Sequence, residues 1–235
     1  MNGRVLLLPV GLKDGRPVLI SEIPEAESGR NCGCVCPNCG GPLVAIQGPF
    51  QQPHFTHERV DCAYDARNAT LVGLLEMARE ILLLEKRIML PGLEITDENE
   101  DEPPEEPGTM RGPVRRRRVA YPGIVSVTDA HFEREAGEPI PRLVVETGRG
   151  PVQVELLVRR QAAKSAQKAS EYRGGGCAAI EIDLSRTTYP EILDRGSLRS
   201  LLVFNTVNKD WLHDDRRQEA ERDLREAERS PSVDR

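Results

Sequence analysis

Five of the six cysteines and two of the four histidines lie within one short segment, Cys32–Cys62. Inside it, two residues separate Cys36 from Cys39, and thiolates at this spacing on a tight turn can bind the same tetrahedral ion. Gly40 and Gly41 follow, and they supply the positive φ angles that a chain needs where it curls around a metal. The segment therefore predicts a zinc site in which Cys36 and Cys39 are two of the ligands.

The remaining zinc ligands must come from residues downstream, and the spacing leaves more than one choice open. His57 with Cys62 gives a Cys-Cys-His-Cys set, whereas His54 with His57 gives a Cys-Cys-His-His set whose histidines are unusually close in sequence. Cys32 and Cys34 are spare candidates. Because enough protein ligands are available to complete the coordination shell, we expect a closed, structural zinc site.

A cluster of disulfides is the alternative interpretation of the same cysteines. Disulfides persist in oxidising compartments, but the apolar run Val5–Leu8 is too short for a secretory signal, and Gly11–Gly15 interrupts it. No stretch of the sequence is apolar enough to cross a membrane. The sequence therefore favours zinc and a cytoplasmic location, with no membrane partner.

The net charge of −6 does not decide between classes of partner, because the charge is unevenly spread. Glu94–Glu106 holds eight acidic residues and no basic one, so the rest of the chain carries +2. Arg111 and the run Arg115–Arg118 come soon after. These arginines could contact phosphates or fold back on the acidic stretch, and both interpretations stay open.

Residues 1–66 have the pattern of a small β element. The apolar runs Arg4–Val10 and Pro17–Ile20 flank an Asp-Gly turn within Lys13–Arg16, which predicts a β-hairpin. Leu43–Ile46 predicts a further short strand. These strands provide little core, so we expect this zinc-ribbon-like element to need its metal in order to fold.

Residues 67–213 have the pattern of one mixed domain, α+β or α/β in class, and a charged helical tail follows at 214–235. The leucine spacing of Asn68–Ile88 predicts an amphipathic helix that Pro91–Gly92 ends, and the acidic stretch 94–112 predicts a disordered insert. Strands are predicted at 123–128, 143–146, 152–158, 177–184 and 201–205, and further helices at 161–172 and 214–229. The first three of these strands suggest a meander, and the strand–helix–strand order after them predicts a parallel crossover.

Several segments together resemble the competence-protein CoiA-like family. The segments are Gly29–Cys39, Leu43–Ala45, His54–His57 and Ala178–Ser185, in this order along the chain. The resemblance implies a zinc-finger-like element at the N-terminus, followed by a PD-(D/E)xK nuclease domain. That domain has a restriction-endonuclease-like core of αβββαβ order, which matches the helix and strands predicted for residues 67–213.

The resemblance also implies a catalytic role for Glu155, which would bind a divalent cation, usually magnesium, that activates water. Two other positions of the motif differ here, because Leu157 stands where the family has a lysine and Arg142 stands at the aspartate position. Lys164 or Lys168, on the helix predicted next, could supply a lysine in space. A second acid could come from Glu146, Asp129, Glu133, Glu76 or Glu80.

Two functions follow from the resemblance and the residues. The first is a DNA-associated protein of nuclease fold, working in DNA uptake, processing or defence, with structural zinc and a magnesium site at Glu155. The second is a catalytically inactive module that binds nucleic acid or a protein, with Arg142, Arg159 and Arg160 contacting DNA phosphates. In both, DNA is the expected partner, and the tail 214–235 is a candidate binding segment for a protein.

Overall fold

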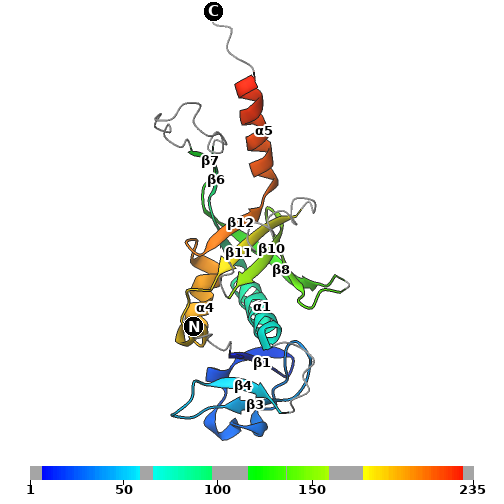
Figure 1. Cartoon of the computed structure of the whole chain (residues 1–235), viewed down its shortest axis with the longest axis vertical. Coiled ribbons are helices and arrows are strands. Elements are labelled where there is room, and N and C mark those ends of the chain that lie inside the picture. Colours follow the sequence, from blue (N-terminus) through cyan, green and yellow to red (C-terminus); the bar gives the residue numbers. More distant parts are fainter. Residues whose placement is uncertain (1–6, 59–65, 97–115, 136, 159–176, 230–235) are drawn as a thin grey trace, which may run out of the picture.

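The computed structural model of this chain is a mixed α+β protein that describes residues 7–58, 66–96, 116–135, 137–158 and 177–229. A small N-terminal part holds two short hairpins, and a larger part packs helices against a six-stranded mixed sheet. Figure 1 shows the N-terminal part at one end of the molecule, with a hairpin and the last helix projecting from the other end. Within the described ranges, no helix is long and apolar enough to cross a membrane.

The first hairpin forms around the predicted Asp-Gly turn. β1 (Val10–Lys13) and β2 (Arg16–Leu19) pair antiparallel, and Asp14 and Gly15 between them have φ angles of 51° and 76°. Two positive φ angles in succession are typical of a type I′ turn, whose twist matches that of the strands. Of the predicted strand 4–10, residues 4–6 lie outside the described residues; the strand that pairs at this turn begins at Val10, because the turn sets the register of the pair.

The second hairpin has one strand with the predicted bounds. β3 (Leu43–Ile46) pairs antiparallel with β4 (His54–His57), which places Leu43 opposite His57. The 3-10 turns η1 (Ile20–Glu22), η2 (Glu25–Glu27) and η3 (Arg30–Cys32) lie between the two hairpins in sequence. Apolar side chains and three cysteines form a small core here: Leu8, Ile20, Ile23, Cys32, Cys34, Cys36, Leu43, Ala45, Phe55 and Ala69.

The long helix α1 (Ala66–Glu85) connects the two parts of the protein. A Cβ added at Gly73 would lie 3.0 Å from the Cβ of Val10, so the helix approaches β1 more closely than a side chain would allow. The helix ends three residues before the predicted Ile88, because Lys86 adopts a φ of 53° and Arg87 begins a strand. A left-handed residue is a common helix stop.

The six-stranded sheet has the order β12-β11-β10-β9-β8-β5. Its strands are β5 (Arg87–Leu90), β8 (Gly123–Glu133), β9 (Arg142–Thr147), β10 (Gly150–Leu157), β11 (Ala178–Asp183) and β12 (Lys209–His213). The predicted meander of β8, β9 and β10 and the predicted parallel pairing of β10 with β11 are both confirmed. The helix predicted at 161–172 falls outside the described residues.

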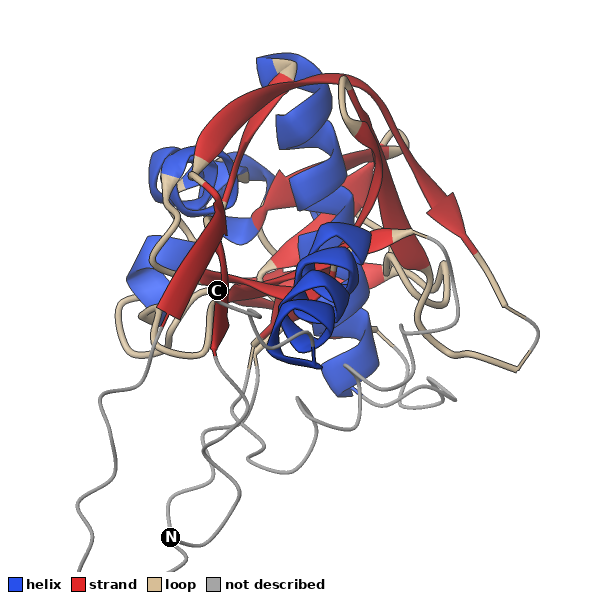
Figure 2. Ribbon diagram, turned by 90° about the horizontal axis from the view of Figure 1, so that it is seen from above, coloured by secondary structure: helices blue, strands red, loops and turns tan. Residues whose placement is uncertain are grey.

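Alternate residues of β10 face opposite sides of this sheet. Val152, Val154 and Leu156 belong to the large core, which also contains the apolar side chains of α1. Glu155 and Leu157 therefore lie on the other face. Seen from above in Figure 2, the strands curve around the helices that pack against them.

The prediction of a disordered insert at 94–112 is wrong for its first residues, because a strand forms there. β6 (Leu93–Thr96) pairs antiparallel with β7 (Arg116–Ala120), and the side chains of Leu93 and Ile95 are buried. Arg118 lies 3.0 Å from the carboxylate of Glu94, so at this position the basic run folds back on the acidic stretch. Residues 97–115 lie outside the described part of the chain.

The strand predicted at 201–205 is wrong, because these residues are helical. The chain here forms α3 (Tyr189–Ile192), α4 (Arg195–Arg199) and the π-helix η5 (Ser200–Phe204). Leu198 and Leu202, one helical turn apart, are both buried. A short apolar run has the same pattern in a strand as in a buried helix, so its neighbours decide between them.

The last helix, α5 (Asp215–Arg229), begins one residue after its predicted start. Asp214 is its N-cap, since its Oδ1 accepts a hydrogen bond of 2.9 Å from the backbone N–H of Arg216. α5 packs against β6 and β7. The guanidinium of Arg216 also lies over the ring of Trp211, 5.7 Å from its centroid.

Candidate metal centre

Three of the predicted zinc ligands come together in the N-terminal part. The Sγ atoms of Cys36 and Cys39 and a ring nitrogen of His57 all lie within 4.8 Å of one another. Cys39 Sγ is 3.4 Å from His57 Nε2. Ordinary zinc–sulfur and zinc–nitrogen bonds at a tetrahedral angle would separate these two atoms by about 3.6 Å, so the geometry fits one zinc ion.

The turn that carries the two cysteines is built by backbone hydrogen bonds. The N–H of Cys36 donates to the carbonyl of Gly41 at 2.8 Å, and that of Gly40 donates to the carbonyl of Cys36 at 2.9 Å. Gly40 has a φ of 70°, as expected from the sequence, but the same expectation is wrong for Gly41, whose φ is not positive. The N–H of Gly41 points at Cys39 Sγ from 3.4 Å, which stabilises the thiolate that a metal requires.

There is little room for a side chain at position 41, because the Cys39 sulfur lies beside it. A Cβ added there would lie 3.3 Å from Cys39 Sγ and 3.8 Å from Cδ2 of His57. A larger residue would therefore press on the Cys39 sulfur and contact the ring of His57.

His57 reaches the cysteines because of the pairing of β3 with β4. Leu43, its partner on β3, donates its backbone N–H to the carbonyl of Cys34 at 2.9 Å, so β3 joins the cysteine segment to the strand that carries the histidine. His54 is three residues from His57 and lies on the opposite face of β4. Its Nδ1 is 2.8 Å from the carbonyl of Gln52, and it is not part of the converging group.

Of the other candidate ligands, Cys32 and Cys34 are described by the structure and Cys62 is not. Cys32 and Cys34 are buried in the small apolar core, where Cys32 donates to the carbonyl of Leu43 and Cys34 to that of Cys32. Burial raises the pKa of the Cys34 thiol to about 12, which disfavours a thiolate. Cys62 lies outside the described residues. Cys36, Cys39 and His57 are thus the ligands that the described residues provide.

Soft thiolates with one imidazole form a donor set typical of zinc. Cys36 is buried and Cys39 and His57 are half-buried, so the site lies at the edge of the small core. A metal held here would join the cysteine turn to β4 across the hairpin. The described residues therefore form a cluster that can hold a metal ion.

The predicted nuclease residue Glu155 lies on β10, opposite Glu181 in the parallel register with β11. Adjacent strands are about 4.8 Å apart, so the two carboxylates share one region of the sheet face. Leu157, at the lysine position, lies opposite Asp183. Among the described residues, the acids of this face do not form a group of three carboxylates close enough to share an ion.

Strand register also decides which of the proposed second acids are near Glu155. Glu146 pairs with Pro151, four residues before Glu155 on β10, which places it about 13 Å away along the strand. Asp129 pairs with Glu146 and is equally distant along the strands. Glu181, which was not among the proposed second acids, has the pairing closest to Glu155, and the register of β10 with β11 is what reveals it.

The arginine predicted to contact DNA is engaged within the protein. Arg142 forms two contacts with the carboxylate of Glu135, at 2.6 and 2.8 Å, and its partner on β8 is Glu133. This pairing offsets the charge of Arg142. The other residues proposed for catalysis or DNA contact, Lys164, Lys168, Arg159 and Arg160, lie outside the described residues.

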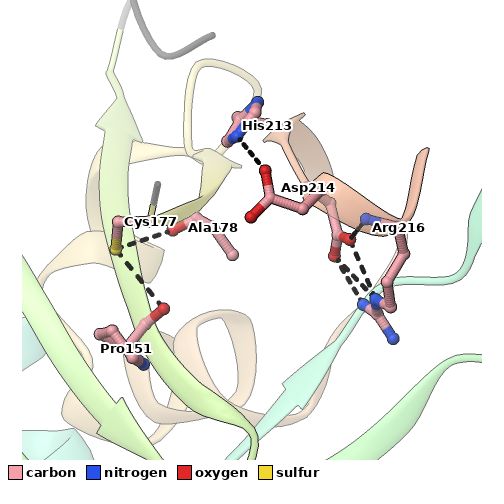
Figure 3. Close-up of polar contacts among 7 residues, drawn as sticks. Pro151, Cys177, Ala178, His213, Asp214 and Arg216 are labelled. Atoms are coloured by element: carbon pink, nitrogen blue, oxygen red, sulfur yellow. Dashed lines mark hydrogen bonds and ion pairs between the residues drawn. The ribbon is translucent and has the colours of Figure 1, made fainter. Parts of the chain in front are cut away.

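The sixth cysteine and a buried histidine form contacts that the sequence did not predict. Cys177 donates to the carbonyls of Pro151 and Ala178 (Figure 3). His213 Nε2 is 3.1 Å from a carboxylate oxygen of Asp215. Burial raises the pKa of the Cys177 thiol, which disfavours the nucleophilic thiolate. These contacts hold the start of β11 and the end of β12 in place.

No family model, no curated protein and no solved structure matches this chain.

Proposed function

We propose that this chain is a cytoplasmic, DNA-associated protein of nuclease-like fold, whose N-terminal part is held together by a structural zinc ion. The observation that carries the zinc assignment is the convergence of Cys36, Cys39 and His57, with 3.4 Å between Cys39 Sγ and His57 Nε2. Cys62 is the proposed fourth ligand. Reduced thiols in a metal site are typical of a reducing compartment, which supports the cytoplasmic location.

Metal analysis of the purified full chain tests the zinc assignment. We expect about one zinc ion per chain in the wild type and loss of most of it in Cys36→Ser. Cys34→Ser is the matched control, because Cys34 is equally buried and only two residues away but hydrogen bonds to a backbone carbonyl. Equal zinc content in the two variants would contradict the assignment.

The nuclease-like part of the proposal is supported by the order of the sheet. After α1 the chain forms β5 and the β6–β7 hairpin, then the meander β8-β9-β10, and β11 adds parallel to β10. Apart from β5 and the hairpin, this is the strand order of an αβββαβ core, whose second helix would fall outside the described residues. The departures at the motif disfavour cleavage, since Leu157 cannot assist catalysis and Arg142 puts a cation, paired with Glu135, in place of the motif aspartate. Binding by a degenerate nuclease site is therefore the function that we place first.

Magnesium-dependent DNA cleavage is the second candidate function, and the register neighbours Glu155 and Glu181 favour it. These two carboxylates would hold the ion, which would supply an activated water. Incubation of plasmid and single-stranded DNA with magnesium tests this function. Cleavage that is lost in Glu155→Gln and retained in Glu138→Gln, an exposed acid of the β8–β9 loop, would establish it, whereas no cleavage would exclude it.

A further inference from the structure

Four cysteines lie within eight residues of the N-terminal part: Cys32, Cys34, Cys36 and Cys39. The thiols of Cys32 and Cys34 donate hydrogen bonds to backbone carbonyl oxygens, at 3.3 and 3.5 Å. Cys39 Sγ is instead an acceptor, because the backbone N–H of Gly41 points at it from 3.4 Å. A thiol that donates holds its proton, whereas a sulfur that binds a metal is a thiolate. The four sulfurs therefore differ in reactivity, although they are close in sequence.

The four cysteines also differ in their exposure to solvent. Cys32, Cys34 and Cys36 are 0%, 2% and 1% exposed, whereas Cys39 is only half-buried, at the edge of the small core. A peroxide oxidises a thiolate that it can reach. Cys39 is therefore the first sulfur of the four that a peroxide in solution would oxidise.

Cys36 lies close enough to Cys39 for the two sulfurs to form a bond. Their Sγ atoms are within 4.8 Å of each other, and both residues belong to one turn, in which the N–H of Gly40 donates to the carbonyl of Cys36 at 2.9 Å. Residues three apart in a turn have Cα atoms within about 7 Å, a separation that a disulfide spans. An oxidised Cys39 therefore has a second metal-binding thiolate beside it.

We propose that the turn Cys36–Cys39 is a redox switch, in which hydrogen peroxide joins the two cysteines as a disulfide and the zinc ion is released. The Cys39 thiolate attacks a peroxide oxygen and the O–O bond breaks, which gives a sulfenic acid and hydroxide. The Cys36 thiolate then attacks the sulfur of the sulfenic acid and displaces a second hydroxide. With two protons, the two thiolates and one peroxide give one disulfide and two waters, so two electrons pass from sulfur to oxygen. Of the three ligands that the described residues provide, His57 alone is left, and one imidazole does not hold zinc.

The cysteine turn packs on α1, so a change in the turn affects the larger part of the protein. A Cβ added at Gly73 of α1 would lie 3.4 Å from Cγ of Pro37, which follows Cys36 in the turn, and 3.0 Å from Cβ of Val10. Surfaces packed this closely transmit small displacements. Formation of the disulfide with loss of zinc therefore loosens the contact between the N-terminal part and α1. This inference rests on the proposed zinc ion and deepens it by giving the site a regulatory role.

Titration of the full, reduced, zinc-loaded chain with hydrogen peroxide tests the proposal, with a chromogenic chelator that measures released zinc. We expect release of about one zinc ion per chain and a loss of about 2 Da from the tryptic peptide Asn31–Arg59, both reversed by dithiothreitol and added zinc. Hydrogen exchange should become faster in α1 around Gly73 and stay unchanged in β10.

A double variant identifies the cysteines that react. Cys32→Ser/Cys34→Ser leaves Cys36 and Cys39 as the only cysteines of the peptide Asn31–Arg59, and it should release zinc and lose mass like the wild type. If this variant does not fold, fragmentation of the unreduced wild-type peptide shows which two cysteines are joined.

The outcomes separate this inference from the zinc assignment on which it rests. If the reduced chain holds zinc and keeps it in an excess of peroxide that fully oxidises glutathione in the same time, the switch is refuted while the zinc assignment stands. A disulfide between any other pair of cysteines also refutes the switch, and unchanged exchange around Gly73 refutes its effect on α1. If the reduced chain holds no zinc, the switch and the zinc assignment are both refuted.

Discussion

Lys209 is a buried amine whose titration should control how the stability of this protein depends on pH. Its side chain lies on β12 opposite Ile182 and is 2% exposed, and its Nζ donates a hydrogen bond of 2.6 Å to the carbonyl of Asn205. Burial lowers the pKa of this amine from 10.5 to about 7. The folded protein therefore holds a neutral lysine at pH values where the unfolded chain holds a charged one.

The size of the effect follows from the two pKa values. Between pH 10.5 and pH 7 the unfolded chain binds a proton that the folded chain does not, so the free energy of unfolding falls as the pH falls through this window. The difference between the pKa values corresponds to about 5 kcal/mol. Lys209→Met removes this dependence but loses a hydrogen bond that contributes about 1 kcal/mol.

We therefore expect Lys209→Met to be about 4 kcal/mol more stable than the wild type at pH 6 and to have lost this advantage by pH 10. Urea unfolding at a series of pH values measures this, followed by the fluorescence of Trp211, the single tryptophan. Lys86→Met, at an exposed lysine, should show the same difference from the wild type at every pH. If the difference for Lys209→Met is also constant with pH, the reasoning from burial is refuted.

Three further predictions concern the N-terminal part. Phe55→Ala, at a ring that is 2% exposed, should lower the free energy of unfolding by about 3 to 5 kcal/mol, whereas Phe50→Ala should change it by less than about 0.5 kcal/mol; similar melting temperatures for the two would contradict this packing. Gly41→Ala should weaken zinc binding about tenfold in competition with a chelator, because the new Cβ presses on Cys39 Sγ, and an unchanged affinity would show that the sulfur has room to move. Arg195 contacts carboxylates of η1 and α1, so Arg195→Gln should lower the free energy of unfolding by about 1 kcal/mol and speed proteolysis between the two parts of the protein. A digestion rate equal to that of the wild type would show that Arg195 does not hold the two parts together.

The predictions that were confirmed depend on residues close together in sequence. The Asp14-Gly15 turn requires two positive φ angles in succession, and the cysteine turn requires Gly40, so the sequence of a few residues is enough to predict each. The strand over Leu43–Ile46 and most of α1 follow from apolar periodicity in the same way. The parallel pairing of β10 with β11 was predicted because parallel strands need a long connection.

The predictions that failed depend on contacts between distant segments. Ser200–Phe204 is apolar enough for a strand, but it is helical because Leu198 and Leu202 pack into the core one turn apart. β6 forms where the beginning of an insert was predicted, because it pairs with β7 and its Ile95 is buried. The local pattern of a short segment does not indicate which distant segment it will pack against.

By itself, the sequence predicted a turn at Cys36 and Cys39 that can hold a metal ion, because two thiols three residues apart and the glycine after them are a local pattern. Tertiary structure alone decided which histidine joins them, since His54 and His57 are equivalent in sequence but lie on opposite faces of β4. It also decided that Glu181 is the register neighbour of Glu155. The physical reason is the same in both cases: strand pairing fixes which side chains share a face, and a change of one residue in register would reverse it.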